Sequence, residues 1–229
     1  MKKKITAIVL AAGSGRRMGG DIPKQYMELS GKPVIYYSLK VFQDSVVDDI
    51  VLVVSDEYIE YCRKEIVERY GFSKVTDIIS GGRERYDSVR NGLEVCESAD
   101  YVLIHDGARP FVKDKMIFDC VNALKIANGC LTALKATDTV KICENEAVKT
   151  TLDRNKIYFA QTPQGVDSKL YKKICESVSD TDFTDDASVL ESSGEKVIIV
   201  NGDRSNIKIT TPFDLVLAEA IVREEEKCE

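Results

Sequence analysis

A glycine-rich loop near the N-terminus carries the clearest chemical signal in this sequence. It runs Leu10-Ala11-Ala12-Gly13-Ser14-Gly15-Arg16-Arg17-Met18-Gly19 and is followed by Pro23-Lys24-Gln25. The apolar run 5–10 before it is typical of a buried strand. A glycine-rich turn after such a strand lets backbone N–H groups converge on phosphate, and two arginines and Lys24 add positive charge. We therefore predict a nucleoside triphosphate site. The alternative is a tight turn whose arginines are solvated.

The spacing in this loop excludes two common nucleotide motifs. No Gly-Lys-Ser or Gly-Lys-Thr follows, so it is not a Walker loop. Gly13, Gly15 and Gly19 give G-x-G-x-x-x-G, which is one residue longer than the dinucleotide fingerprint. The loop therefore predicts phosphate binding but matches neither of these two motifs.

Two further polar clusters follow predicted strands directly, Gly81-Gly82 after 75–80 and His105-Asp106 after 101–104. Ligands of parallel sheets bind beyond the carboxyl ends of the strands, so we expect these clusters to meet the first loop at one sheet edge. Asp106 could hold a divalent cation such as Mg²⁺, or it could form a turn before a glycine. His105, the single histidine, we interpret as structural.

Arg17, Lys24 and Lys208 are candidates for neutralising phosphates. Lys208 alternates with isoleucines in Asn206-Ile207-Lys208-Ile209, so it could also be a solvent-facing residue of a short strand. Phosphoryl and nucleotidyl transfer need positioning and positive charge more than a covalent nucleophile. Isolated cations beside glycine loops, in a sequence without a catalytic triad motif, fit that chemistry.

Strand-like and helix-like segments alternate along the chain, which predicts an α/β fold. We expect a Rossmann-like, mostly parallel sheet flanked by helices. The predicted strands are 5–10, 50–54, 75–80, 101–104, 130–134 and 196–201. The predicted helices are 57–70, 84–96, 114–127, 168–177, 184–192 with Thr184 as N-cap, and a last helix that opens at Thr211-Pro212-Phe213-Asp214.

The alternation breaks between residues 138 and 158. Two short alternating pieces flank Glu144-Asn145-Glu146, which predicts a β-hairpin outside the parallel core. A hairpin with few large apolar residues is marginally stable alone. We expect it to pack on a second subunit; the alternative is a local surface arm.

The composition of the chain argues against several classes of function. The 229 residues are 44% hydrophobic and 31% charged, as in an ordinary globular protein, and the net charge of −6 disfavours a broad nucleic-acid-binding surface. The seven scattered cysteines show no C-x-x-C spacing and indicate reduced thiols in a cytoplasmic protein. The lysines before the first apolar run mimic a signal peptide, but that run is short. No apolar stretch approaches the roughly 20 residues of a membrane helix, so we expect no membrane association.

Taken together and in order, the motifs resemble the 2-C-methyl-D-erythritol 4-phosphate cytidylyltransferase family over nearly the full length. The matching segments are Ala11-Ala12-Gly13-Ser14-Gly15-Arg16-Arg17-Met18, Pro23-Lys24-Gln25-Tyr26, Gly81-Gly82-Arg83-Glu84-Arg85, Asp87-Ser88-Val89, His105-Asp106-Gly107-Ala108-Arg109-Pro110, Asp153-Arg154-Asn155, Gln161-Thr162-Pro163-Gln164, Thr184-Asp185-Asp186-Ala187-Ser188 and Asn206-Ile207-Lys208.

The resemblance implies a single nucleotidyltransferase domain over 1–229, with an inserted β-arm at 137–159 that swaps across a homodimer. It implies transfer of CMP from CTP to methylerythritol phosphate, with a divalent cation such as Mg²⁺. The implied CTP contacts are Ala11, Ala12, Gly13, Gly15, Arg17, Lys24, Gly82 and Ser88. Asp106 and Lys208 would lie at the reacting centre, Asp106 orienting substrate or metal. Thr139 and Arg154 would reach the partner's substrate phosphate, and Thr162 and Thr184 would line the alcohol pocket.

Two positions depart from the family pattern: Gly107 stands where some members have alanine, and Arg83 stands where an acidic residue is frequent, so we leave Arg83 out of the site. Two rival readings remain. A ribitol-5-phosphate cytidylyltransferase would share most motifs but usually differs at Asp153-Arg154-Asn155. A non-catalytic nucleotide-binding module could use the same fold.

Overall fold

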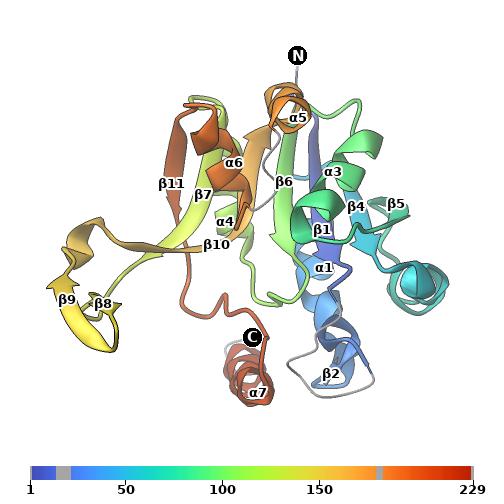
Figure 1. Ribbon diagram of the computed structural model, residues 1–229. Coiled ribbons are helices and arrows are strands. Elements are labelled where there is room, and N and C mark those ends of the chain that lie inside the picture. The colour runs from blue at the N-terminus through green and yellow to red at the C-terminus, as the bar shows by residue number, and fades with distance from the viewer. Residues whose placement is uncertain (1, 14–21, 179–182, 228–229) are drawn as a thin grey trace.

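A seven-stranded sheet organises the computed structural model, which describes residues 2–13, 22–178 and 183–227. The strands lie in the order β11-β7-β10-β6-β1-β4-β5 (Figure 1). β10 runs antiparallel to both of its neighbours, and the other pairs are parallel. The mostly parallel sheet of the prediction is thus confirmed. The strands are β1 (Ile5–Ala11), β4 (Asp49–Val54), β5 (Val75–Ser80), β6 (Tyr101–Asp106), β7 (Gly129–Lys135), β10 (Tyr158–Asp167) and β11 (Val197–Asn201).

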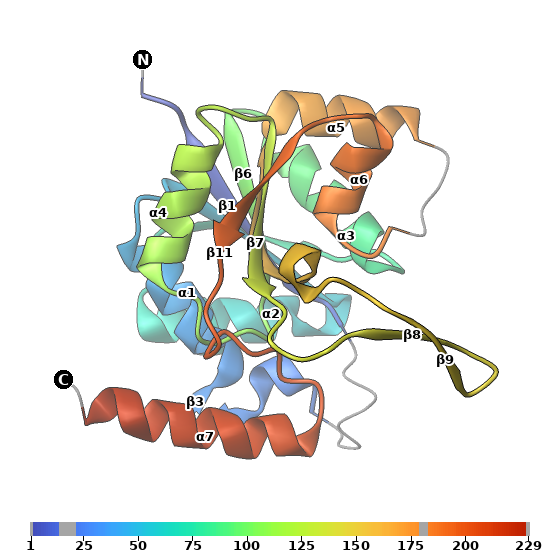
Figure 2. The same cartoon turned by 90° about the vertical axis from the view of Figure 1, so that its left-hand side faces the viewer.

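Helices cover both faces of the sheet, as Figure 2 shows. On one face, α1 (Val34–Asp44), the π-helix η4 (Cys62–Glu68) and α4 (Asp114–Ala123) pack apolar side chains such as Phe42 onto the strands. On the other face lie α3 (Arg85–Val95), α5 (Ser168–Ser177) and α6 (Asp186–Ser192). The central strands are rich in Val and Ile because they are buried on both faces.

A smaller layer lies beyond the carboxyl ends of the strands (Figure 1). It consists of α7 (Pro212–Glu226) and the short strands β2 (Glu28–Leu29) and β3 (Lys32–Pro33). Apolar residues of α7 and β2 share a third cluster. Thr211 caps α7 through a capping box with Asp214, as predicted. This layer borders the sheet edge at which the site is expected (Figure 1).

The predicted hairpin is formed by β8 (Lys141–Glu144) and β9 (Ala147–Thr151). Its turn residues Asn145 and Glu146 both have positive φ, at 49° and 64°, which is the turn geometry that suits two-residue hairpins. Every residue of both strands is exposed, and the hairpin projects from the body as an arm (Figure 2). The short helix η5 (Arg154–Lys156) leads from it into β10.

The elements of the sequence prediction differ from the structure in several bounds. The helix predicted over 57–70 is divided into η3 (Asp56–Tyr58), α2 (Ile59–Tyr61) and η4. The helix predicted over 114–127 ends at Ala123. The N-cap of α6 is Asp185, which accepts from the Ser188 N–H at 3.0 Å, so the prediction of Thr184 as N-cap is wrong. Asp is as good a cap as Thr, and the sequence offers both in succession.

Among the elements of five or more residues, α1 and β10 were not predicted from the sequence. β10 contains the polar segment Gln161-Thr162-Pro163-Gln164, whose composition is typical of a loop. The segment is nevertheless buried, because its side chains are satisfied by hydrogen bonds within the protein. Conversely, the described chain has no strand at 206–210, so Lys208 does not lie in the short strand considered for it.

Six cysteines fall in the described part of the chain and all are free thiols. Five are buried and Cys143 on the arm is exposed, which agrees with the predicted reduced state. Cys228 lies outside the described residues. Among the helices described, none combines the length and the apolar character that a membrane span requires.

Candidate active site

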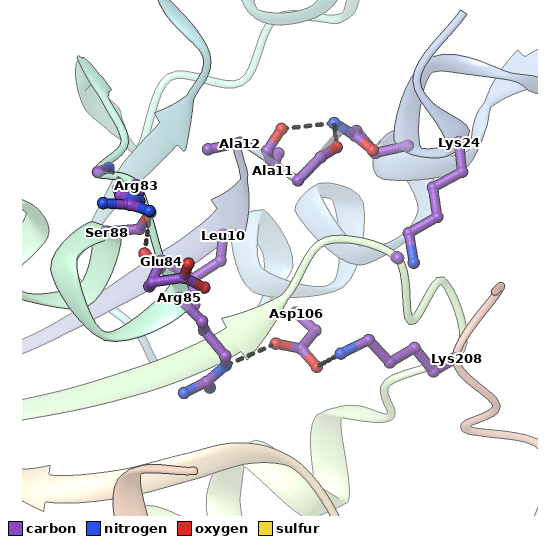
Figure 3. Close-up of a pocket in the computed structure, with 14 residues that line it drawn as sticks. Leu10, Ala11, Ala12, Lys24, Arg83, Glu84, Arg85, Ser88, Asp106 and Lys208 are labelled. Atoms are coloured by element: carbon purple, nitrogen blue, oxygen red, sulfur yellow. Dashed lines mark hydrogen bonds and ion pairs between the residues drawn. The ribbon is translucent and has the colours of Figure 1, made fainter. Parts of the chain in front are cut away.

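A cleft of about 480 Å³ opens at the carboxyl edge of the sheet (Figure 3). Its walls come from the end of β1, the turn around η2 (Lys24–Tyr26), the start of α3, the end of β6 and the segment before α7. Gly15 and Arg17 lie outside the described residues. Eight residues singled out from the sequence line this one cleft: Ala11, Ala12, Gly13, Lys24, Gly82, Ser88, Asp106 and Lys208.

Gln25 fixes the turn that carries Lys24. Its side chain is 2% exposed, and Nε2 donates to the carbonyl oxygen of Ala11 at 2.6 Å and of Gly13 at 3.1 Å. The Pro23-Lys24-Gln25 turn is therefore bonded to the end of β1, and Lys24 lines the same cleft as Ala11 and Ala12 (Figure 3). A buried amide that satisfies two carbonyls in this way is a rigid support.

The opposite wall depends on close packing of glycines. A Cβ on Gly81 would lie 2.4 Å from the Ala12 Cβ, and one on Gly82 would lie 2.1 Å from the Asp87 Cβ. The Ser88 hydroxyl accepts from the Gly82 N–H at 3.0 Å and donates to the Glu84 carbonyl at 3.1 Å. The two loops can thus approach each other only because Gly81 lacks a side chain, and the absence of one at Gly82 lets its own loop pack on the start of α3.

Asp106 is the buried carboxylate of the cleft, and cations surround it. Lys208 Nζ lies 2.7 Å from Oδ2, Arg85 Nε lies 3.3 Å from Oδ1, and Arg109 Nε lies 3.9 Å from Oδ2. Burial alone would raise the pKa of this carboxyl, but the three cations outweigh it and hold the pKa well below its usual range. Asp106 is therefore ionised at neutral pH.

Lys208 points into the cleft because the backbone around it is tied down. The Ile209 N–H donates to the Ala108 carbonyl at 2.9 Å. Asn206 is fully buried, and its Nδ2 donates to the Thr162 carbonyl at 2.8 Å. The lysine between these anchors reaches Asp106 with a side chain that is 37% exposed, so it can meet a ligand from solvent.

Behind Asp106 lies a buried chain of hydrogen bonds. The Asp106 N–H donates to Thr162 Oγ1 at 3.1 Å, and Thr162 Oγ1 lies 3.0 Å from His105 Nδ1. His105 Nε2 lies 3.1 Å from the Arg109 carbonyl, which can only accept, so Nε2 carries the proton and the Thr162 hydroxyl donates to Nδ1. Burial lowers the pKa of His105 to about 4, which keeps the ring neutral. His105 has the structural role expected of it.

These hydrogen bonds hold Thr162 in a buried position behind Asp106. The sequence resemblance put Thr162 in the lining of an alcohol pocket, but its side chain is 3% exposed and its hydroxyl is engaged by Asp106 and His105. Thr162 supports the Asp106 backbone from behind. The other three residues assigned to the second substrate, Thr139, Arg154 and Thr184, are exposed and do not line the cleft.

Two arginines of the cleft were not assigned to the site from the sequence. Arg83 lines the cleft although the family pattern argued for leaving it out. Arg85 lines it too and pairs with Asp106 and, at 2.7 Å through Nη2, with Asp186. The signal for Arg85 was its place three residues after Gly82, at the start of the helix predicted over 84–96.

The described residues do not build a metal site from protein ligands. They contain no group of three or more His, Cys, Asp or Glu side chains placed to share an ion. Asp106, the predicted ligand, has a cation on each oxygen, so it would share those oxygens between Mg²⁺ and Lys208 or Arg85. The described residues of the cleft therefore do not form a metal site of their own.

Sequence comparison shows that the chain belongs to a known family. A family model described as 2-C-methyl-D-erythritol 4-phosphate cytidylyltransferase matches residues 5–224. Proteins of that name from Lachnoclostridium phytofermentans and Lachnospira eligens are 44% and 47% identical to this chain, over 97% and 93% of it and 97% and 96% of their own length.

Solved structures agree with the sequence relatives. A crystal structure of 4-diphosphocytidyl-2C-methyl-D-erythritol synthase from Anaerococcus prevotii superposes with a TM-score of 0.84 at 34% identity, covering 96% of this chain and 99% of that one. The 2-C-methyl-D-erythritol 4-phosphate cytidylyltransferase of Francisella tularensis gives a TM-score of 0.77 at 31% identity, over 95% and 99%.

Proposed function

Because the chain belongs to the 2-C-methyl-D-erythritol 4-phosphate cytidylyltransferase family, we propose that it transfers CMP from CTP to 2-C-methyl-D-erythritol 4-phosphate. The products are 4-diphosphocytidyl-2-C-methyl-D-erythritol and pyrophosphate, a step of non-mevalonate isoprenoid precursor synthesis. One observation carries the proposal: residues 10–13, Lys24, Gly82, Asp106 and Lys208 come from distant parts of the sequence and line one cleft.

The reaction needs electrostatic help rather than a protein nucleophile. A phosphate oxygen of the alcohol phosphate attacks the α-phosphorus of CTP, the new P–O bond forms, and the bond to the β-phosphate oxygen breaks as pyrophosphate leaves. Lys24, with Arg17, would offset the charge that develops on the α-phosphate and the leaving group. Lys208 would steady the reacting phosphates, held in place by its 2.7 Å contact with Asp106.

The first loop and the start of α3 suit CTP. Residues 11–13 line the cleft, and their backbone N–H groups would contact the triphosphate, while Gly82 and Ser88 form the wall that would receive the nucleoside. A divalent cation would come into the cleft with CTP, bound mainly through phosphate oxygens, since Asp106 is already paired on both sides. When bound, it would neutralise charge on the pyrophosphate.

The second substrate's site is completed by a second subunit in this proposal. Thr139 and Arg154 lie at the base of the exposed arm and outside the cleft, and Arg154 Nη1 donates to the Thr137 carbonyl at 2.9 Å. An arm exposed over its whole length is a poor element for a monomer. We therefore infer a homodimer in which the 137–159 arm carries both residues to the partner's cleft, with 1–229 acting as one nucleotidyltransferase domain.

The cytoplasm is the proposed compartment. The six described cysteines are free, as is common where thiols are kept reduced.

A substrate competition tests the proposed function. The purified protein is incubated with CTP and Mg²⁺ and offered methylerythritol phosphate, ribitol 5-phosphate or neither, and phosphorus NMR follows the products. We expect pyrophosphate and a CDP-alcohol with methylerythritol phosphate and negligible pyrophosphate with CTP alone. Preferred turnover of ribitol 5-phosphate would establish the rival cytidylyltransferase, and absence of turnover with both alcohols would contradict the proposal.

A further inference from the structure

Arg85 joins two buried carboxylates, of which one lies outside the cleft. Its Nε contacts Asp106 Oδ1 at 3.3 Å, and its Nη2 donates to Asp186 Oδ2 at 2.7 Å (Figure 3 shows the contact with Asp106). The side chains of the two carboxylates are 12% and 2% exposed. Asp186 does not line the cleft, and its contact with Arg85 links it to Asp106.

Asp186 is itself held in a fixed orientation. Its second oxygen, Oδ1, accepts the Tyr171 hydroxyl of α5 at 3.0 Å. The next residue's N–H, that of Ala187, donates to Gln164 Oε1 of β10 at 2.9 Å. The start of α6 is therefore bonded to two other elements. A carboxylate with both oxygens engaged in this way presents Oδ2 to Arg85 from one direction.

A guanidinium can serve two acceptors from a rigid planar fork, which an ammonium cannot. With Nη2 committed to Asp186, the plane of Arg85 is set, and Nε faces Asp106 Oδ1. Asp106 is then held between Arg85 on one oxygen and Lys208 on the other. Burial opposes the charge on Arg85, but Asp186 and Asp106 outweigh it and raise the pKa of the guanidinium, so the fork stays charged.

We propose that Asp186 is a positioning residue that orients Arg85, so that Arg85 fixes the Asp106–Lys208 pair for nucleotidyl transfer. The proposal rests on the proposed function and adds a residue to it. It predicts that loss of Asp186 lowers kcat without a matching loss of CTP affinity, because Asp186 does not line the cleft that receives CTP. A merely structural ion pair would lower stability and leave kcat per folded molecule unchanged.

A double-mutant cycle tests the route through Arg85. Asp186→Asn keeps the shape of the side chain, and Arg85→Lys keeps the charge but not the fork. We expect each variant to lose about 10- to 100-fold in kcat, the scale at which removal of an orienting partner acts. The KM for CTP of Asp186→Asn should change less than about threefold, because Asp186 lies outside the cleft. The kcat of the double variant should lie no more than about threefold below the kcat of the less active single variant, because both changes break the same contact route from Asp186 through Arg85.

Tyr171→Phe and Glu94→Gln complete the set. Tyr171→Phe removes the hydroxyl from Asp186 but keeps the buried ring, and we expect a smaller loss that disappears in the Arg85→Lys background. If Asp186→Asn does not fold, Tyr171→Phe takes its place beside Arg85→Lys in the double-mutant cycle. Glu94→Gln breaks the exposed contact of Glu94 with Lys172, which also joins α3 to α5, and it should leave kcat unchanged.

Three results would overturn the positioning role: a kcat of folded Asp186→Asn equal to wild type, a kcat of Arg85→Lys equal to wild type, or losses that multiply in the double variants. Wild-type turnover is measured beside them and tests the proposed function separately. Whichever alcohol phosphate wild type prefers then serves as substrate for all variants, so the ratios of kcat remain interpretable if methylerythritol phosphate is not that substrate.

Discussion

Replacing Asp106 by Asn tests the electrostatic account of the cleft. The change keeps the shape of the side chain but removes the charge that faces Lys208 at 2.7 Å and Arg109 at 3.9 Å. Removing one partner of a buried ion pair costs about 3–5 kcal/mol. Arg85 keeps Asp186, and the Lys208 side chain is 37% exposed, so water screens part of the loss. We expect the free energy of unfolding at pH 7 to fall by about 2–3 kcal/mol.

The pH dependence of that difference follows from the sign of the pKa shift. The cations depress the pKa of Asp106 in the folded protein, below the value of about 3.9 that it has unfolded. A depressed pKa contributes stability that is present above the unfolded pKa and lost as pH falls through the folded pKa. The difference between wild type and Asp106→Asn should therefore be full from about pH 5 upward and shrink below about pH 4.

Urea unfolding of both proteins between pH 3 and pH 7, followed by circular dichroism, measures this difference. Isothermal titration with CTP adds a second readout, since Lys208 and Arg109 lose their counter-charge in the variant. We expect CTP to bind at least as tightly as to wild type while kcat falls by about 100-fold or more. A stability difference that stays constant from pH 7 to pH 3, or no difference at pH 7, would refute the reasoning.

Three further predictions concern the rest of the site. Lys24→Ala should lower turnover by at least about 100-fold in steady-state assays, while Lys32→Ala, which alters an exposed lysine near Tyr36, should be near wild type. Gly81→Ala places a Cβ 2.4 Å from the Ala12 Cβ and should weaken CTP binding by calorimetry by about tenfold or more; unchanged affinity would show that the two loops can separate freely. Val148→Asp puts a charge on the exposed arm and should shift the sedimentation coefficient from dimer to monomer, together with a rise in KM for the alcohol phosphate; a wild type that is an active monomer would remove the role of Arg154 across subunits.

The parts of the fold that follow apolar periodicity could be predicted from the sequence. The strands of Val and Ile and the helices 84–96 and 168–177 agree with the structure to within a residue or two at their ends. β10 could not be predicted in this way. Its central residues, among them Thr162 and Gln164, are buried by side-chain hydrogen bonds to other elements, and such partners are invisible in the local pattern.

The residues of the candidate site likewise fall into those that could be predicted from the sequence and those whose roles depend on contacts between distant segments. Glycine loops and strand-end residues converge at one edge of a parallel sheet, so the sequence alone was enough to expect Gly82 and Asp106 to lie together. The role of Lys208 depends on Asn206 and Ile209, which anchor its backbone to distant segments. Arg85 and Asp186 are 101 positions apart in sequence, and their contact depends on how α3 and α6 pack on one face of the sheet.

A structure of the protein with CTP and Mg²⁺ tests the central claim most directly, namely that this cleft holds the nucleotide for attack on its α-phosphorus. The account predicts the triphosphate against residues 11–13 with Lys24 and Lys208 within hydrogen-bonding distance of phosphate oxygens, and the nucleoside beside Gly82 and Ser88. A triphosphate bound elsewhere, or one in this cleft that neither lysine contacts, would contradict it.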